Sequence, residues 1–353
     1  MKERICFFIH TEYHLLLAIN EIISKYSDTN SYEVELILKR SIKSPRLKQD
    51  LDLSYIPYPV KILEINYDFK QRLSSTEKND LDAFLNLEFD SFNFFQEQDP
   101  ISIIFINHYI KKGTTINLFQ DGLKPYVANN MSFSIAQVIN DIKQNFWIRK
   151  NGYPVLNYFS FINCKNYGFV KGIDRLYLTF PKAYKNWNQL PIENINPEFT
   201  TQLIETLKQV FIWDDSMLSE RKEIIFFMNQ PMHDDGSFEV KVLEYLQEKY
   251  PATSIYIKNH PLTSQIKLNA YKKLKNVKII NSKIPAELFI GLLEDSIVFS
   301  VSSTSMFIDN PKCKYYYIFD IKEGNNIKRI KKYKIFNPTE HVITARSIDE
   351  IAF

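Results

Sequence analysis

The chain has 353 residues, more than one compact core usually holds and about the size of two ordinary domains. Its composition, 45% hydrophobic and 24% charged, excludes a disordered or fibrous chain. Only 8 residues are Gly, which argues against a glycine-rich phosphate loop, and a formal net charge of +3 is too small to indicate nucleic-acid binding.

Three scattered cysteines without CxxC spacing indicate a reducing compartment, with neither a disulfide framework nor a zinc site; they are Cys6, Cys164 and Cys313. The apolar run at 5–9 is too short for a signal peptide, and no run approaches the roughly 20 apolar residues of a membrane span. We therefore expect a cytoplasmic protein. Association with the inner face of the membrane stays open through the irregular aromatic segment 151–173 and the basic run 328–334, whose plainer interpretation is a solvated face.

In the first half, apolar runs alternate with segments of helical spacing. Strands are expected over 4–9, 33–39, 60–65, 101–106, 114–119 and 174–179. Helices are expected over 15–23, 75–87 and 130–150. A strand, a polar turn and a helix at the start are typical of a doubly wound α/β domain.

The second half repeats this order after a Pro-containing linker at 186–200 and a helix over 198–210. Strands are expected over 223–228, 254–257, 277–280, 296–301 and 315–319, and helices over 238–249 and 286–293. We predict two Rossmann-like domains, 1–190 and 191–353, that face each other across a cleft. Many nucleotide-sugar glycosyltransferases share that architecture, so it leaves function open.

Polar residues follow several of these strands, where ligands of open α/β sheets bind. Asp121 precedes Gly122 after the strand at 114–119; it is either a general base for a sugar hydroxyl or an ordinary Asp-Gly turn. His260, before Pro261, is either a donor to a departing phosphate or a surface turn histidine. Lys258 faces the same crevice or solvent.

A run of four hydroxyls, residues 302–305, follows the strand at 296–301. Ser302 and Ser303 either cap a helix or bind an anion at its N-terminus, and four hydroxyls exceed what one cap requires. Glu287, in the first turn after Pro285, either stabilises its own helix or accepts the hydroxyls of a ribose.

Three further features complete the candidates. Gln230 lies in a loop that could border the ligand. Thr11 either caps the first helix or lines the acceptor side. The run 233–235 (His-Asp-Asp) lacks a second ligand group at suitable spacing, so we expect no metal site.

Three of these motifs, in this order, resemble signatures of the bacterial sialyltransferase and polysialyltransferase families. The signatures are an acidic pair before Gly, His-Pro and paired Ser, found here as Gln120-Asp121-Gly122, His260-Pro261 and Ser302-Ser303. Gln230-Pro231 and the segment 285–287 also resemble the donor-binding half of the family. One position departs from the pattern, because Gln120 replaces the first acid.

The resemblance implies a GT-B type, inverting, metal-independent glycosyltransferase that moves sialic acid from CMP-Neu5Ac to a glycan acceptor, without a cofactor, in bacterial capsule or lipooligosaccharide synthesis. It implies an acceptor-side N-terminal domain and a C-terminal domain for the CMP-sugar. It also implies a role for each residue: Asp121 is the base, His260 assists the leaving CMP phosphate, Ser302 and Ser303 hold that phosphate, Glu287 holds the ribose, and Lys258 lies near the cytosine.

Two alternatives stay open at this point. One is transfer of another CMP-activated sugar, such as Kdo or another nonulosonic acid, because the same CMP half-site would serve both. The other is a non-catalytic nucleotide-binding scaffold subunit, although such a protein would have no need to keep both Asp121 and His260.

Overall fold

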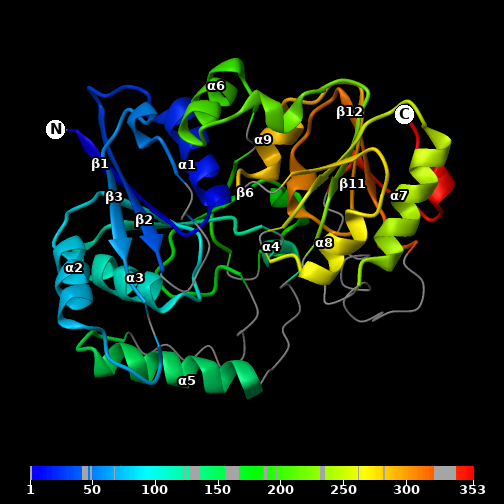
Figure 1. Ribbon diagram of the computed structural model, residues 1–353. Helices are drawn as coiled ribbons and strands as arrows, with labels where there is room; N and C mark the ends of the chain where they lie inside the picture. Colours follow the sequence, from blue (N-terminus) through cyan, green and yellow to red (C-terminus); the bar gives the residue numbers. More distant parts are fainter. Residues whose placement is uncertain are drawn as a thin grey trace. The chain divides into compact units, whose positions relative to one another are not determined.

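The computed structural model describes residues 2–41, 47, 50–66, 68–122, 124–127, 135–155, 167–186, 189–195, 198–230, 235–260, 262–280, 283–321 and 339–353. The chain divides into two compact units, Met1–Thr206 and Leu207–Phe353. Each unit contains its own parallel sheet (Figure 1). The predicted α/β architecture is therefore confirmed within each half.

The first unit is built on seven parallel strands in the order β3-β2-β1-β4-β5-β6-β7. They are β1 (Glu3–Ile9), β2 (Tyr32–Arg40), β3 (Val60–Glu64), β4 (Ser91–Phe94), β5 (Thr115–Phe119), β6 (Arg175–Leu178) and β7 (Ile192–Asn194). Its helices are α1 (Glu12–Lys25), α2 (Ser75–Leu85), α3 (Pro100–Lys112), α4 (Lys124–Val127) and α5 (Ile135–Lys150), with short 3₁₀ turns at Leu53–Tyr55 and Pro181–Ala183. The boundary between the units falls inside α6 (Thr201–Val210).

The second unit has six parallel strands in the order β10-β9-β8-β11-β12-β13. They are β8 (Ile225–Met228), β9 (Ile255–Lys258), β10 (Val277–Ile280), β11 (Ser296–Ser300), β12 (Cys313–Tyr317) and β13 (Val342–Thr344). Its helices are α7 (Ser237–Lys249), α8 (Gln265–Tyr271) and α9 (Ala286–Gly291), with 3₁₀ turns η3 (Asp215–Leu218), η4 (Thr304–Phe307) and η5 (Ile348–Glu350).

Strand order places the candidate residues. In the first sheet the order reverses between β1 and β4, and in the second between β8 and β11. Ligands of open parallel sheets bind outside the carboxyl ends of the strands at such a reversal. Asp121 follows β5, next to β4, whereas Gln230, His260 and Ser302 follow β8, β9 and β11.

The prediction of a strand at 101–106 is wrong, because this run lies in α3 (Pro100–Lys112). Asp99 accepts the backbone N–H groups of Ile101 and Ser102, and Pro100 stands at the first helical position, where it needs no donor. The helix is buried on nearly all sides, so its apolar residues show no one-sided periodicity and resemble a buried strand. The strand of this region is β4 (Ser91–Phe94), four buried residues that lie in the aromatic segment before Asp99.

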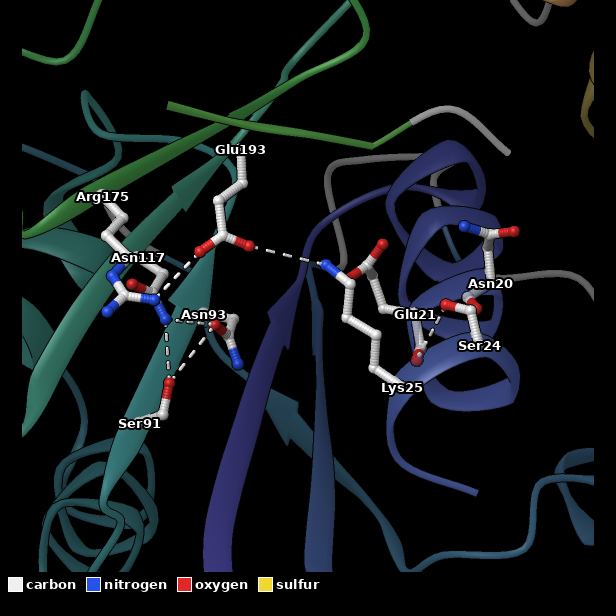
Figure 2. Close-up of polar contacts among 9 residues, drawn as sticks. All are labelled: Asn20, Glu21, Ser24, Lys25, Ser91, Asn93, Asn117, Arg175 and Glu193. Atoms are coloured by element: carbon white, nitrogen blue, oxygen red, sulfur yellow. Dashed lines mark hydrogen bonds and ion pairs between the residues drawn. The ribbon is translucent and has the colours of Figure 1, made fainter. Parts of the chain in front are cut away.

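The linker at 186–200 contains a strand. Residues of β7 pair with β6, and Glu193 lies between Arg175 of β6 and Lys25 of α1 (Figure 2). Its carboxylate accepts from Arg175 at 2.9 Å and lies 3.7 Å from the Lys25 ammonium. Residues 191–206, which the sequence assigned to the second domain, thus belong to the first compact unit.

The last strand is also later than expected. β13 (Val342–Thr344) pairs with β12 beyond the strand predicted at 315–319, and the helix expected after the serine run is one 3₁₀ turn, η4.

Polar side chains bridge β4 and β5 inside the sheet. Asn117 donates through its side-chain amide to Ser91 and Asn93, each at 2.9 Å (Figure 2). Asn93 in turn donates to the carbonyl of Cys6 on β1 at 3.0 Å. Buried polar groups need such partners. These bonds link the three strands whose carboxyl ends carry the acceptor-side candidates.

Candidate functional site

Asp121 lies directly after β5 in a tight turn. Gly122 has φ +58°, a left-handed conformation that suits glycine, and the Lys124 N–H donates to the Asp121 carbonyl at 3.3 Å. The side chain of Asp121 is 29% exposed, and His14 Nε2 lies 3.1 Å from its Oδ1. The structure therefore presents a carboxylate that solvent reaches and that a histidine holds.

His14 is fully buried in the first turn of α1, and its surroundings determine which nitrogen carries the proton. The backbone N–H of His10 donates to Nδ1 at 3.4 Å, so Nδ1 accepts and Nε2 carries the hydrogen that points at Asp121. The ring also stacks on Phe95, with centroids 4.3 Å apart and planes 7° apart. His14 is thus held as a neutral donor, a role the sequence reasoning did not assign to it.

Thr11 caps α1, because its hydroxyl accepts the His14 backbone N–H at 3.2 Å. The plainer of the two interpretations of Thr11 is confirmed. By fixing the first turn of the helix, this cap also fixes the backbone that carries the His14 ring.

The surroundings of Gln120 explain why an amide stands here in place of the first acid of the acidic pair. Its side chain is fully buried, where its Oε1 accepts from the Thr179 N–H at 2.9 Å and from the Tyr126 hydroxyl. The Tyr126 oxygen in turn accepts the Phe180 N–H at 3.0 Å. An amide satisfies these groups without burying a charge. Gln120 therefore joins β5 to the end of β6 and leaves the exposed position to Asp121.

His10, Asp99 and Lys39 form a buried ionic cluster in the same unit. Lys39 donates to Asp99 Oδ1, and His10 Nε2 lies 3.5 Å from Asp99 Oδ2 and 3.4 Å from the Ser102 hydroxyl. Burial lowers the pKa of His10 to about 4, which the Asp99 carboxylate only partly offsets. Burial alone would raise the pKa of Asp99, but Lys39 and His10 hold it well below its usual range. The cluster ties the end of β1 to the start of α3.

Glu97, in the loop after β4, is a second buried carboxylate of this half. Both of its oxygens accept the Gly168 N–H, at 3.0 and 3.2 Å. Burial raises the pKa of Glu97 to about 6, although Lys124 and the backbone N–H groups of Gly168, Val170 and Phe169 act in the opposite direction. Glu97 thus fastens the segment from Gly168 to the carboxyl edge of the sheet.

In the second unit, buried side chains fix the loop after β8. Lys267 and Glu239 form an ion pair of 2.9 Å with both side chains fully buried, and the Lys267 ammonium also donates to the Gln230 carbonyl at 3.3 Å. The Asn229 amide donates to the Thr263 hydroxyl at 2.8 Å, and the Tyr271 hydroxyl donates to Asn229 at 3.1 Å. These contacts fix the ends of β8 and β9 against each other.

His260 is half-buried after β9 and has a defined proton arrangement. Its Nδ1 accepts the Leu262 N–H at 3.1 Å, so in the neutral ring the hydrogen lies on Nε2. The His260 carbonyl accepts the Thr263 hydroxyl at 2.7 Å and the Thr263 N–H at 2.9 Å. Thr263 therefore positions both Asn229 and His260.

Glu287 and Lys258 are two buried ionisable residues, and Glu287 contacts the serine run. The Ser305 hydroxyl donates to Glu287 Oε1 at 2.8 Å, and the Lys258 ammonium lies 5.7 Å from the centroid of the Phe289 ring. Burial raises the pKa of Glu287, while its own backbone N–H, Ser305 and Lys258 lower it. Both ionisable side chains are thus placed in the core rather than in solvent.

Ser302 and Ser303 are buried at the end of β11, each 8% exposed. The Ser303 hydroxyl accepts the Ser305 N–H at 3.3 Å as the cap of η4, and the Ser303 N–H donates to Ser300 Oγ at 3.1 Å. The Tyr317 hydroxyl donates to the Ser303 carbonyl at 3.0 Å. The capping role is therefore present, and anion binding stays a prediction.

The structure groups the candidates in two sets. One set, in the first unit, contains Thr11, Asp121 and Gly122, with His14 added. The other, in the second unit, contains Gln230, Lys258, His260, Glu287, Ser302 and Ser303, with Asn229 and Ser305 added. Asn229 adjoins Gln230 at the end of β8, and that position is the signal that could have found it. His14 lies in the first turn of α1 after Thr11, where the sequence indicated an acceptor-side position but not the contact with Asp121.

Several predictions concern residues that the structure does not describe. Pro231, Pro261, His233, Asp234, Cys164 and the basic run 328–334 lie outside the described residues. Among those that are described, no three His, Cys, Asp or Glu side chains are grouped so that they could hold a metal ion. In the same part of the chain, no helix combines the length and apolar character needed to cross a membrane.

A hollow of about 490 Å³ lies in the second unit, away from the candidates of that unit. Its lining includes Ser296 and Cys313, the first residues of β11 and β12, and Glu223. It is therefore at the amino ends of the strands, the edge opposite to the one where nucleotides bind in such sheets.

The sequence of the chain matches one known family. A model of the alpha-2,8-polysialyltransferase family matches residues 17–323. A search of curated proteins finds no match.

Solved structures share the fold at low identity. The GT-B domain of a sialyltransferase from Photobacterium damselae is 12% identical, with TM-score 0.57, and the match covers 97% of this chain and 99% of that one. A 2,6-sialyltransferase from Photobacterium sp. JT-ISH-224, solved with CMP and lactose, is 11% identical, with TM-score 0.57 and coverage of 97% and 78%. UDP-GlcNAc 2-epimerase from Methanocaldococcus jannaschii is 10% identical, with TM-score 0.52 and coverage of 98% and 90%. At these identities the likeness shows the fold alone, which is of the GT-B type.

Proposed function

Because the chain belongs to the alpha-2,8-polysialyltransferase family and is a glycosyltransferase of the sialyltransferase kind, we propose that it transfers sialic acid from CMP-Neu5Ac to a hydroxyl of a glycan acceptor. The observation that carries this proposal is the Asp121 carboxylate at the carboxyl edge of the first sheet, partly exposed and held by a neutral His14. A sugar hydroxyl becomes a nucleophile when such a carboxylate takes its proton.

In this proposal the His14 N–H orients Asp121 and stabilises its ionised form. His14 cannot take the proton onward without losing its bond from the His10 N–H, because protonation would place a hydrogen on Nδ1. Asp121 is therefore the group that accepts the proton, and His14 positions it.

The second unit would bind the donor. The leaving group, CMP, develops negative charge on its phosphate as the sugar departs, and preorganised donors stabilise such charge. His260 would donate from Nε2, with Nδ1 occupied by the Leu262 N–H. Ser302 and Ser303 would hold the phosphate, Glu287 the ribose, and Lys258, Gln230 and Gly122 would complete the substrate contacts. The solved 2,6-sialyltransferase with CMP supports a cytidine nucleotide in this fold.

The finer assignments belong to the same proposal. The reaction inverts the anomeric centre without a metal, the acceptor belongs to a bacterial capsule or lipooligosaccharide, and the protein works in the cytoplasm in peripheral association with the membrane. The family suggests an α-2,8 linkage and thus an acceptor that itself ends in sialic acid.

The test follows CMP release and glycan mass with CMP-Neu5Ac, CMP-Kdo and a panel of galactosides and sialosides. We expect transfer from CMP-Neu5Ac. The Asp121→Asn variant should lose ~10²–10⁴-fold in turnover with CMP affinity nearly unchanged, since it removes only the base. His260→Ala and Ser303→Ala should lower turnover through the donor.

Asp174→Asn provides the matched control, because Asp174 accepts the Ile116 N–H at the amino end of the first sheet. Transfer from CMP-Kdo alone would replace the proposed donor. Unchanged kinetics in the Asp121, His260 and Ser303 variants would refute the assignment of the site.

A further inference from the structure

Helix α5 carries an apolar stripe that faces solvent. Ile135, Ile139, Ile142 and Phe146 are 67%, 48%, 49% and 65% exposed. Their spacing of four, three and four residues puts them on one face over the length of the helix. Single exposed apolar residues are common, but a continuous row of four large ones marks an interaction surface.

The rest of the helix shows that the stripe is not needed to hold α5 in place. The opposite face contains Gln144, Trp147 and Ile148, all buried. Trp147 donates from its indole to the Gln71 carbonyl at 2.8 Å, and Gln144 donates to the Gln98 carbonyl at 3.0 Å. Figure 1 shows α5 next to α3 in the first unit, in agreement with their contacts. The helix is therefore anchored by one face and presents the other.

Basic side chains flank the stripe. At about 100° per residue, the exposed Lys143 and Arg149 lie on opposite sides of the stripe, within about 70° of its centre, whereas Asp141 lies about 130° away. Lys150 donates to the Lys70 carbonyl at 3.2 Å and so brings the exposed loop at 70–72 (Lys-Gln-Arg) beside the end of the helix.

We propose that α5 docks the protein on a lipid bilayer with anionic headgroups, lying in the interface with its apolar stripe inserted. Large apolar residues with Lys and Arg at their borders are the pattern of helices that lie in such an interface. A second copy of the chain fits this face less well, because pairing two stripes would bring their Lys143 and Arg149 side chains together.

This inference names the surface for the membrane association in the proposed function and rests on that function for its purpose. Gln98, which Gln144 contacts, directly precedes Asp99 in the loop after β4, on the edge of the sheet where Asp121 lies. Docking through α5 therefore sets the acceptor-side edge of the first unit beside the bilayer.

The experiment is flotation of the full chain with vesicles of phosphatidylglycerol and phosphatidylcholine, and with vesicles of phosphatidylcholine alone. We expect binding to the anionic vesicles that weakens as salt increases. The triple variant Ile139→Ser/Ile142→Ser/Phe146→Ser should bind at least about a hundredfold more weakly, since three inserted side chains are lost. Lys143→Glu/Arg149→Glu should bind at least about 25-fold more weakly, since each basic residue near such a surface contributes about fivefold.

Matched controls change equally exposed residues elsewhere. Ile62→Ser/Ile343→Ser removes side chains that are 41% and 51% exposed, and Lys171→Glu/Lys241→Glu reverses two exposed charges; both should bind like the unchanged chain. Transfer to a water-soluble acceptor without vesicles should be unaffected by the triple variant. This readout keeps the docking surface separate from the proposed function, which fails if the unchanged chain transfers no sugar.

Two outcomes overturn the inference. One is that the unchanged chain does not float with anionic vesicles, or that the triple variant floats equally well. The other is that sedimentation velocity shows a dimer that the triple variant dissociates while vesicle binding is absent, which would assign the stripe to a second copy.

Discussion

The buried ion pair of Lys267 and Glu239 gives the sharpest prediction for the second unit. Both side chains are fully buried, with Nζ and Oε1 2.9 Å apart. Replacing Lys267 by Met removes one charge and leaves the Glu239 carboxylate in the core. Removal of one partner from a buried pair typically destabilises a protein by ~3–5 kcal/mol. Since small domains have total stabilities of about 5–15 kcal/mol, this is a large fraction for the second unit.

The exposed pair of Lys312 and Glu294 provides the comparison. Its Nζ and Oε1 are 2.7 Å apart, but the side chains are 60% and 49% exposed. Such pairs contribute little because solvent screens their charges, so Lys312→Met should change the free energy of unfolding very little. Geometry is nearly the same in the two pairs, and only burial differs.

Urea denaturation of the single and double variants measures the effect. Lys267→Met/Glu239→Leu should be more stable than Lys267→Met alone, because the uncompensated charge is gone. Lys267→Met should also weaken CMP binding, since the Gln230 carbonyl loses a donor at 3.3 Å. A cost for Lys267→Met as small as that for Lys312→Met, or a double variant no more stable than the single one, would refute the reasoning.

Three further predictions concern the first unit. His14→Phe keeps a ring stacked on Phe95 but removes the N–H that donates to Asp121. A hydrogen bond to a charged group contributes ~1.5–3 kcal/mol, so kcat should fall about 10–100-fold while the KM for the donor stays unchanged. An unchanged kcat would contradict the positioning role of His14. The pKa of His10 is about 4 in the folded chain and 6.5 in the unfolded chain, so the stability that neutral His10 contributes above pH 6.5 should fall by up to ~3 kcal/mol as pH drops toward 4. Denaturation of His10→Gln over the same pH range should show a smaller loss of stability. The pKa of Glu97 is raised from 4.5 to about 6, so the stability that its protonated form contributes is present below pH 4.5 and is lost, by about 2 kcal/mol, as pH rises through 6. Glu97→Gln should remove this pH dependence from thermal melts. A variant with the same pH profile as the unchanged chain would exclude this role of Glu97.

Local patterns in the sequence predicted most elements and the candidate residues. Alternating apolar runs identify β1, β2, β3, β5 and β8 because a buried strand is apolar over a short length, and α7 because its apolar face repeats at helical spacing. Polar residues at strand ends then identify Asp121, His260 and Ser302, since carboxyl ends of parallel strands bind ligands.

The same patterns fail where burial is uniform. The run at 101–106 is apolar in every direction, so periodicity cannot separate a strand from the buried helix α3, and only the cap at Asp99 and Pro100 favours the helix. β7 was hidden in a proline-containing segment because its pairing with β6 and the contacts of Glu193 are long-range.

What the sequence by itself determined is therefore which residues are candidates for the chemistry: a carboxylate before Gly122, a histidine before Pro261 and a serine pair after a strand. What only the tertiary structure decided is their burial, their hydrogen-bond partners and, for histidine, the tautomer. The pairing of β1 with β4 and of β8 with β11 joins strands distant in sequence, and it places the candidates at or one strand away from the two reversals of strand order. The tautomer of His14 depends on the His10 N–H and on Asp121, 107 residues away, and the hidden charge of Lys267 depends on Glu239. Such contacts follow from packing, because desolvation and hydrogen-bond geometry are properties of neighbours in space rather than in sequence.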